Sequence, residues 1–195
     1  MASGATISIL LAIPLLTAAI WIALIVHSLL FPTLRVWPVP VPAQRAIYLR
    51  TWLNRSTGLV TGLSALCLVC LGVLDFESLQ LARPVHLGVG AALFLAGGCL
   101  AGLGFLTLGP EISTGATPDT VQLKGPYRIS RNPQYVGTVA VLLGFGLLAN
   151  SSLCIVASLG WCVWFLVAPF AEEAFLRSQV GAAYESYVES TPRYL

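Results

Sequence analysis

The segment GPYRISRNPQYVG, residues 125–137, is a polar interruption in a chain that is otherwise mostly apolar. Its two prolines, Pro126 and Pro133, prevent a regular helix from running through it. Arg128 and Arg131 place fixed positive charge shortly before the next apolar run. We therefore expect this segment to lie between membrane helices and to form one wall of a ligand site.

The composition indicates an integral membrane protein. Of the 195 residues, 57% are hydrophobic and only 9% are charged, whereas soluble domains carry about 25% charged residues. So few charged side chains cannot cover a water-facing surface, and no nucleic-acid partner is expected. The cysteines lie in apolar runs, and the Cys67–Cys70 pair lacks the second CxxC or the nearby histidine of a metal site. We assign no disulfide and no metal.

Five apolar segments are candidates to cross a bilayer as helices, which takes about 20 residues each. They cover residues 6–30, 57–74, 85–108, 135–149 and 152–170. Only Asn150 and Ser151 separate the last two, which predicts a tight antiparallel hairpin. In the third segment, Gly98 and Gly102 form a small-xxx-small pair that favours close helix packing. The expected fold is an all-α integral membrane bundle of five transmembrane helices, with residues 1–195 in a single domain.

Nine of the ten basic residues fall on one side of the membrane if the chain has five spans and its N-terminus outside. They are Arg35, Arg45, Arg50, Arg55, Lys124, Arg128, Arg131, Arg177 and Arg193. Arg83, in the loop after the second span, is the exception. Because cytoplasmic loops carry the excess of Lys and Arg, we expect the C-terminus and segment 125–137 in the cytoplasm. The run WPVPVP, residues 37–42, favours an extended path at the membrane interface.

The residues after the fifth span have the spacing of a C-terminal amphipathic helix over residues 169–189. Its apolar face holds Leu176, Val180, Ala183, Tyr184 and Tyr187. Glu172 joins this face, and since burying a lone carboxylate is costly, we expect a cationic partner: Arg128, Arg131 or a cationic ligand group. Glu173 lies four residues before Arg177, a favourable spacing for a helical ion pair.

The predicted hairpin returns Tyr135 and Glu172 to the same membrane face. Segment 125–137 should therefore lie against Glu172 and Glu173. A pocket with arginines, a tyrosine, an asparagine and an inward carboxylate suits a zwitterionic, polar cofactor, and the adjacent bilayer can admit an apolar substrate.

Segment 125–137 and the C-terminal run PFAEEAFLRSQVGAAYESYVESTPRYL, residues 169–195, together resemble the isoprenylcysteine carboxyl methyltransferase family. Its wider relatives include phospholipid N-methyltransferases and membrane thiol methyltransferases. The family pattern reads approximately G-P-Y-x-x-x-R-H-P-x-Y-x-G, then E-E-x-x-L-x-x-x-[FY]-G-x-x-Y-x-x-Y and a Pro-Arg close. The matching residues are Gly125, Pro126, Tyr127, Arg131, Pro133, Tyr135, Gly137, Glu172, Glu173, Leu176, Gly181, Tyr184, Tyr187, Pro192 and Arg193. The resemblance covers roughly residues 104–195, whereas residues 1–103 match only as generic membrane helices.

This resemblance implies a membrane-embedded methyltransferase that uses S-adenosylmethionine and takes a lipophilic acceptor from the bilayer. The cofactor-binding residues that it implies are Tyr127, Arg131, Asn132, Pro133, Tyr135, Gly137, Glu172 and Glu173. Arg193, and after it Arg128, are the candidates for orienting an anionic acceptor during catalysis.

Two positions depart from the family pattern. Asn132 stands where a histidine is usual, and Val180 where an aromatic residue is usual. Asparagine donates and accepts hydrogen bonds but is no general base near neutral pH. A carboxylate or thiolate acceptor needs no strong base because it is already anionic, whereas an amine must lose a proton. The resemblance implies an activity like that of isoprenylcysteine carboxyl O-methyltransferases as the first expectation, and a prenylated cysteine, a lipid amine, a small thiol or another lipophilic anion could be the acceptor. The alternatives are phospholipid N-methylation, small-thiol S-methylation, an NADPH-dependent membrane reductase and a non-catalytic membrane subunit.

Overall fold

The computed structural model describes residues 3–38, 44–109, 121 and 123–195, and within residues 44–54 it describes the backbone only. Every regular element in these ranges is helical, which confirms the predicted all-α class for the described chain. The long helices are α1 (Gly4–Leu30), α2 (Gln44–Leu74), α3 (Arg83–Leu108), α5 (Pro133–Leu148) and α6 (Ser152–Val180). The short elements are the 3₁₀ turns η1 (Pro32–Leu34) and η2 (Gly125–Arg128) and the last helix, α7 (Ala182–Ser190).

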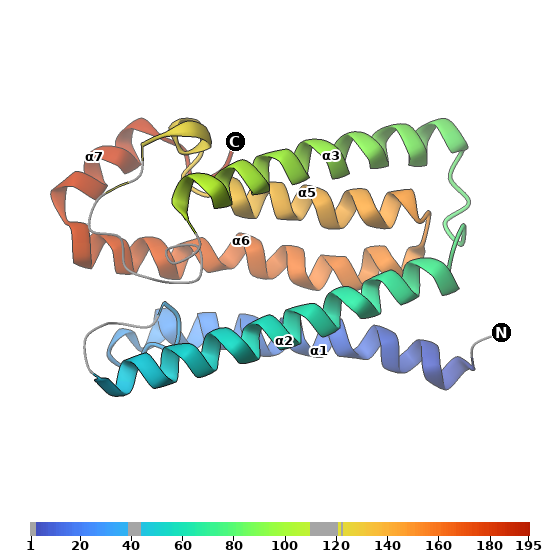
Figure 1. Cartoon of the computed structure of the whole chain (residues 1–195), viewed down its shortest axis with the longest axis horizontal. Helices are drawn as coiled ribbons and strands as arrows, with labels where there is room; N and C mark the ends of the chain where they lie inside the picture. Colours follow the sequence, from blue (N-terminus) through green and yellow to red (C-terminus); the bar gives the residue numbers. More distant parts are fainter. Residues whose placement is uncertain (1–2, 39–43, 110–120, 122) are drawn as a thin grey trace.

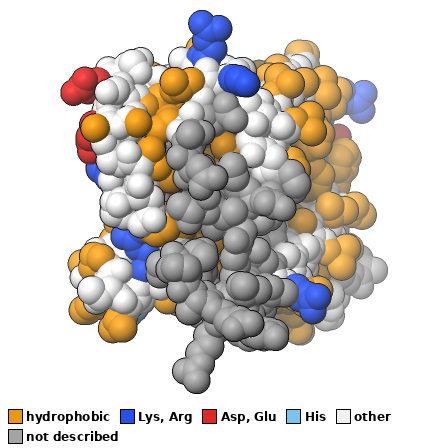
Figure 2. Space-filling model, turned by 60° about the vertical axis from the view of Figure 1, so that its left-hand side comes forward, with side chains coloured by type: hydrophobic (Ala, Val, Ile, Leu, Met, Phe, Trp, Pro, Cys, Tyr) orange, Lys and Arg blue, Asp and Glu red, His pale blue; other side chains and the backbone are white. Residues whose placement is uncertain are grey.

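The long helices run side by side along the longest axis of the molecule, each antiparallel to the one before it (Figure 1). The end that we call the turn end carries the N-terminus and the two turns at residues 75–82 and 149–151. The opposite end, which we call the site end, carries η1, η2, α7 and the beginning of α5. Figure 2 turns the site end toward the viewer and shows Lys and Arg side chains protruding at several points.

Within the described residues, four helices are long and apolar enough to cross a membrane: α1, residues 55–74 of α2, α3 and α6. The predicted fourth span corresponds to α5, which is apolar but has only 16 residues. Large apolar side chains stand exposed on the outside of the bundle, and Leu59, Val73 and Leu106 are 76%, 72% and 77% exposed. Exposed apolar surface on this scale suits contact with lipid rather than with water. The structure thus gives four helices of spanning length and a shorter fifth.

Glycines let α3 and α5 approach to backbone contact. The facing glycines are Gly90, Gly97 and Gly104 on α3 and Gly137 and Gly144 on α5. A Cβ added at Gly97 would lie 2.6 Å from the Gly137 carbonyl oxygen, too close to be accommodated without movement. Close packing through small residues is therefore present, but within the chain it is not formed by the predicted pair, Gly98 and Gly102. An added Cβ would meet only a side chain at 3.9 Å at Gly98 and nothing within 4 Å at Gly102.

The helix α6 is longer than the predicted fifth span and continues through Pro169 to Val180. Gly181 ends it with φ 63° and ψ −133°, a conformation that glycine adopts readily and other residues only with strain. The single helix predicted over residues 169–189 is therefore wrong, because its first part belongs to α6 and the rest is α7. Of its predicted buried face, Tyr184 and Tyr187 are buried, but Ala183 is exposed.

A hydrogen-bonded cluster ties the two turns of the turn end together. Asp75 Oδ2 accepts hydrogen bonds from the hydroxyls of Ser78 and Ser151, both at 2.7 Å. The Asn150 side chain accepts from the Leu81 N–H at 3.1 Å and donates to the Leu81 carbonyl at 3.3 Å. Each turn is thus held by polar groups of the other.

Candidate functional site

The prolines of segment 125–137 each lie in the first turn of a helical element. Pro126 lies in the first turn of η2, and Pro133 is the first residue of α5. Proline is favoured there because its missing N–H would have no helical partner and its φ is already set. Gly125, at φ 54°, makes the bend before η2. These local preferences bring the polar side chains of the segment to the site end, against the last turns of α6.

Glu173 is a buried carboxylate paired with two arginines. Its side chain is 2% exposed. Arg193 donates from Nε to Oε1 and from Nη2 to Oε2, both at 2.9 Å, and its guanidinium carbon lies 4.0 Å from the centroid of the Phe170 ring. Arg131 Nη1 lies 3.3 Å from Oε2. A two-point guanidinium–carboxylate pair is strong and directional, so Glu173 holds the C-terminal residues against α6.

Hydrogen bonds also join the C-terminal residues to segment 125–137. The Arg131 N–H donates to the Pro192 carbonyl at 2.9 Å, and Asn132 Nδ2 donates to the Arg193 carbonyl at 3.1 Å. The Tyr187 hydroxyl of α7 donates to the carbonyl of Tyr127 at 2.7 Å. The side chain at position 132, where the family usually has histidine, therefore binds the C-terminal backbone in this chain.

Glu172 has different surroundings from its neighbour. Its Oε1 accepts a hydrogen bond from Trp37 Nε1 at 2.8 Å and another from the Tyr135 hydroxyl. Trp37 follows η1 and Tyr135 lies in the first turn of α5, so three separate parts of the chain meet at one oxygen. The inward direction predicted for Glu172 and its closeness to Tyr135 are both confirmed.

In the described part of the chain, no basic side chain lies within ion-pair distance of Glu172. Its expected pairing with Arg128 or Arg131 is wrong, because Arg131 is engaged by Glu173 and Arg128 is exposed. The third expected partner, a cationic ligand group, stays a prediction.

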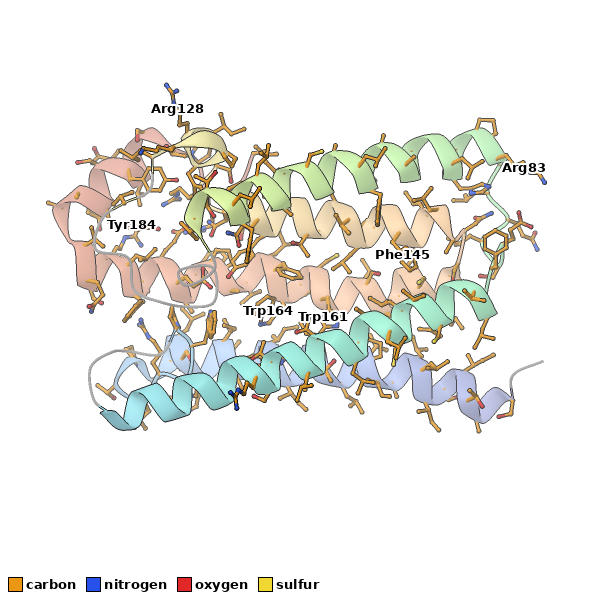
Figure 3. The ribbon with its side chains drawn as sticks, viewed as in Figure 1. Arg83, Arg128, Phe145, Trp161, Trp164 and Tyr184 are labelled. Carbon is orange, nitrogen blue, oxygen red and sulfur yellow. The ribbon has the colours of Figure 1, made fainter. Side chains whose placement is uncertain are left out.

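A cavity of about 540 Å³ lies beside Trp37 and Tyr135, with α2 on one side and α5 and α6 on the other. Its wall is largely aromatic and includes Trp161, Trp164 and Phe165 of α6. Trp161 and Trp164 extend from α6 into the space toward α2 (Figure 3). Because both hydrogen-bond donors of Glu172 line this cavity, the carboxylate lies directly behind its wall.

Three tyrosines around the C-terminal residues are buried, and the hydroxyl of one of them, Tyr187, donates a hydrogen bond to the Tyr127 carbonyl. Burial raises the pKa of Tyr127, Tyr184 and Tyr187, that of Tyr187 to about 12. These phenols are therefore protonated at neutral pH and are poor candidates for a base. The hydrogen bond to Glu173 raises the pKa of the Arg193 guanidinium, which stays charged.

Most of the predicted site residues meet at the site end: Tyr127, Arg131, Asn132, Pro133, Tyr135, Glu172, Glu173 and Arg193. Arg128 lies apart from them, exposed and pointing away from the bundle (Figure 3). Gly137 faces α3, where an added Cβ would lie 2.5 Å from the Ala101 nitrogen. The geometry thus gives Gly137 a packing role. The cofactor roles of the other residues stay predictions, as does the role of Arg193 and Arg128 in orienting an acceptor.

The ion pair predicted between Glu173 and Arg177 is wrong. Arg177 pairs with Glu185 of α7 instead, at 3.0 Å. The turn at Gly181 brings α7 and the C-terminal residues back along α6. This explains why Arg177 pairs with Glu185 and why Glu173 pairs with Arg193.

Two residues of the site end were not predicted. Trp37 is 135 positions away from its hydrogen-bond partner Glu172, and Arg35 lies with its guanidinium carbon 5.1 Å from the centroid of the Phe175 ring. The only sequence signal was an arginine and a tryptophan between the first span and a proline-rich run. That pattern is equally typical of a membrane-surface anchor.

Residues 85–183 match the family described as phospholipid methyltransferase. The match covers just over half of the chain, begins in α3 and ends in α7, so it extends further toward the N-terminus than the predicted limit near residue 104. Searches of curated proteins and of solved structures each gave no match. The spanning helices and this match identify a multi-pass membrane protein of methyltransferase type. The chain belongs to the phospholipid methyltransferase family, within the wider group of membrane methyltransferases that resemble isoprenylcysteine carboxyl methyltransferase.

Proposed function

We propose that this chain is a methyltransferase that uses S-adenosylmethionine and acts on a lipophilic acceptor. The observation that supports this most strongly is the position of Glu172. Its carboxylate has no cationic partner among the described residues and is held by Trp37 and Tyr135, which line an apolar cavity. Fixed charges lie on one side of this point and an apolar space on the other. A site at this boundary can hold a polar cofactor on one side and a lipid acceptor on the other, with their reacting groups next to each other.

The residues present fit the cofactor. Arg131 Nε is enclosed and has no hydrogen-bond acceptor among the described residues, whereas Nη1 of the same guanidinium pairs with Glu173. Such an N–H group suits a carboxylate like that of the amino-acid part of S-adenosylmethionine, and Glu172 offers a negative charge to a cationic group. When bound, this cofactor supplies an activated methyl group on a positively charged sulfur.

The contribution of the chain itself is alignment and the exclusion of water. Trp37 and Tyr135 fix one oxygen of Glu172 from two directions, and the aromatic wall of the cavity keeps the apolar part of an acceptor away from water. The main requirements of methyl transfer are that the nucleophile is aligned with the methyl group and that water is excluded from the reacting groups. A carboxylate or thiolate acceptor would need no further group. An amine acceptor, as in phospholipid N-methylation, would have to lose a proton, and Glu172 is the carboxylate placed beside the cavity to receive it.

The proposal includes a topology with five spans, α5 being the fourth, and with the site end in the cytoplasm. Of the ten basic residues, only Arg83 lies at the turn end (Figure 3). This asymmetry favours a cytoplasmic site end. Chemical labelling of single cysteines introduced at positions 83 and 124 in intact cells tests it, and labelling of position 124 from outside would reverse the orientation.

Thermal unfolding of the detergent-solubilised protein tests the cofactor class. S-adenosylhomocysteine at about 100 times its Kd should stabilise the fold by about 2.7 kcal/mol, because it binds the folded state only. Arg131→Ala should lose most of this stabilisation, whereas Arg83→Ala, exposed at the other end, should keep it. Stabilisation by NADPH alone would identify a reductase, and no response to either ligand would favour a non-catalytic subunit. A screen of membrane extracts with methyl-labelled cofactor then identifies the acceptor.

A further inference from the structure

Arg35 is a cation at the site end without a counter-charge from the described chain. Its Nε and Nη1 are enclosed and have no hydrogen-bond acceptor. No carboxylate of the described residues lies within ion-pair distance of it. The contact of its guanidinium carbon with the Phe175 ring, at 5.1 Å, offsets only part of the cost of enclosing charged N–H donors without acceptors. Among the described residues nothing supplies this charge, and the environment suits an oxyanion.

The backbone around Arg35 is held in place by one buried hydroxyl. Ser28 Oγ accepts the N–H of Val36 at 3.0 Å and the N–H of Trp37 at 3.1 Å. The same hydroxyl donates to the Leu24 carbonyl at 2.8 Å, so it is anchored in α1. The position of Arg35 at the site end is therefore determined by the end of α1.

This anchoring places Arg35 beside Glu172 on α6. Trp37 reaches Glu172, and Arg35 reaches Phe175, three residues further along the same helix. Residues three apart on a helix are neighbours on its surface, with Cβ atoms about 5–6 Å apart. A cation and a carboxylate that are not paired with each other thus border the same turn of α6, next to the cavity that Trp37 lines.

We propose that Arg35 binds the anionic group of the acceptor, a phosphate or carboxylate, while the apolar chains of that acceptor occupy the cavity beside Trp37. This inference rests on the proposed function and assigns to Arg35, which lies outside the matched residues 85–183, the role of orienting the acceptor. Guanidinium groups bind phosphate and carboxylate through several charge-assisted hydrogen bonds. The other source of the same chemistry is the carboxylate of the cofactor, and the experiment separates the two.

The test compares two probes with the same short chains, dihexanoylphosphatidic acid and dihexanoylglycerol, by thermal unfolding of the full chain in detergent. The wild-type protein should bind the phosphate-bearing probe about tenfold more tightly or better, the effect of about one charge-assisted pair. In Arg35→Gln this ratio should fall to about one, while stabilisation by S-adenosylhomocysteine stays at the wild-type value. Lys124→Ala removes an exposed cation at the same end and should keep the ratio, which controls for general attraction of anions.

The proposal is overturned if the wild-type protein does not distinguish the probes, or if Arg35→Gln keeps the wild-type ratio. If Arg35→Gln instead loses only its affinity for S-adenosylhomocysteine, the anion belongs to the cofactor and the assignment to the acceptor is wrong. Arg35→Met keeps the side-chain stem on Phe175 and serves as the test if the glutamine variant does not fold. Failure of the proposed function is read separately, as absence of any response of the wild-type protein to S-adenosylhomocysteine.

Discussion

The two ends of the bundle both hold polar side chains below the surface, and they differ in how the clusters around Asp75 at the turn end and around Glu172 at the site end are satisfied. At the turn end, the Asp75 carboxylate accepts hydrogen bonds from two serine hydroxyls. The Asn150 side-chain amide both accepts a hydrogen bond from the backbone of Leu81 and donates one to it. At the site end, Arg35 has two enclosed N–H groups and Arg131 one, at Nε, that find no acceptor among the described residues, and none of these residues supplies a cation to Glu172. A satisfied cluster stabilises a turn, whereas an unsatisfied one needs an explanation. We infer that a ligand completes it.

The largest effect is expected at Glu173, the buried carboxylate of the site end that pairs with two arginines. Glu173→Ala leaves Arg131 and Arg193 without their shared buried partner and should destabilise the fold by about 3–5 kcal/mol. Reversible unfolding in detergent measures this loss. The control is Glu185→Ala in the pair with Arg177, whose side chains are 53% and 41% exposed, and it should cost about 1 kcal/mol or less. Similar losses in the two variants would contradict a structural role for Glu173.

The next largest effect is expected in the α3–α5 contact, which connects the two ends. Gly97→Ala places a methyl group 2.6 Å from the Gly137 carbonyl oxygen, and such overpacking typically costs about 1–3 kcal/mol. Gly98→Ala is the matched control, because its nearest neighbour is a side chain at 3.9 Å. It should be neutral or slightly stabilising, since alanine is the better helix former. A greater loss in Gly98→Ala than in Gly97→Ala would show that a different face of α3 packs on α5.

Local sequence signals predicted the features of the fold that depend on neighbouring residues. The lengths of the apolar runs predicted the helices, and the two prolines of segment 125–137 predicted the break before α5. The short link at Asn150 and Ser151 predicted the hairpin. That hairpin is sufficient to bring Tyr135 to Glu172, where the structure shows a hydrogen bond.

The features that the sequence could not predict depend on long-range geometry. Arg193 reaches Glu173 because Gly181 reverses the chain, whereas the local i, i+4 rule favoured Arg177. Trp37 reaches α6 because a buried serine anchors its backbone, which no spacing in the sequence encodes. Gly98 was predicted to pack against a neighbouring helix, whereas Gly97 is the residue that faces α5. Adjacent residues point about 100° apart around a helix, and because all faces of α3 are apolar, the sequence does not indicate which one packs against α5.

A moderate loss of stability, without loss of ligand affinity, is expected at the turn end. Asp75→Asn replaces a carboxylate that accepts from Ser78, Ser151 and the Leu153 N–H. Its amide offers a weaker acceptor, and the loss should be about 1–2 kcal/mol. Affinity for S-adenosylhomocysteine should not change. Glu77→Gln, an exposed neighbour, is the control and should be neutral; a matching loss there would indicate a general charge effect.

The same carboxylate predicts a pH dependence with a definite sign. Burial alone would raise the pKa of Asp75, but the hydrogen bonds from Ser151, Leu153 and Ser78 outweigh it and the pKa is lowered. The folded state therefore binds this proton less tightly than the unfolded state. Its contribution is present above the unfolded value near 4 and is lost as the pH falls through the folded value. The stability difference between wild type and Asp75→Asn should shrink from pH 5 to pH 3, and a constant difference would refute this.

The smallest effect on stability, and the sharpest contrast between the ends, is expected from Glu172→Gln. The amide oxygen still accepts from Trp37 and Tyr135, so the stability should change by about 1 kcal/mol or less. The negative charge is lost, however, and affinity for the amino group of S-adenosylhomocysteine should fall about tenfold, the loss of one charge-assisted hydrogen bond. Calorimetry measures this directly. Asp75→Asn should lose stability and keep affinity, while Glu172→Gln should do the reverse. If Glu172→Gln loses stability as Asp75→Asn does and binds normally, then Glu172 is a structural carboxylate and the proposed pocket is wrong.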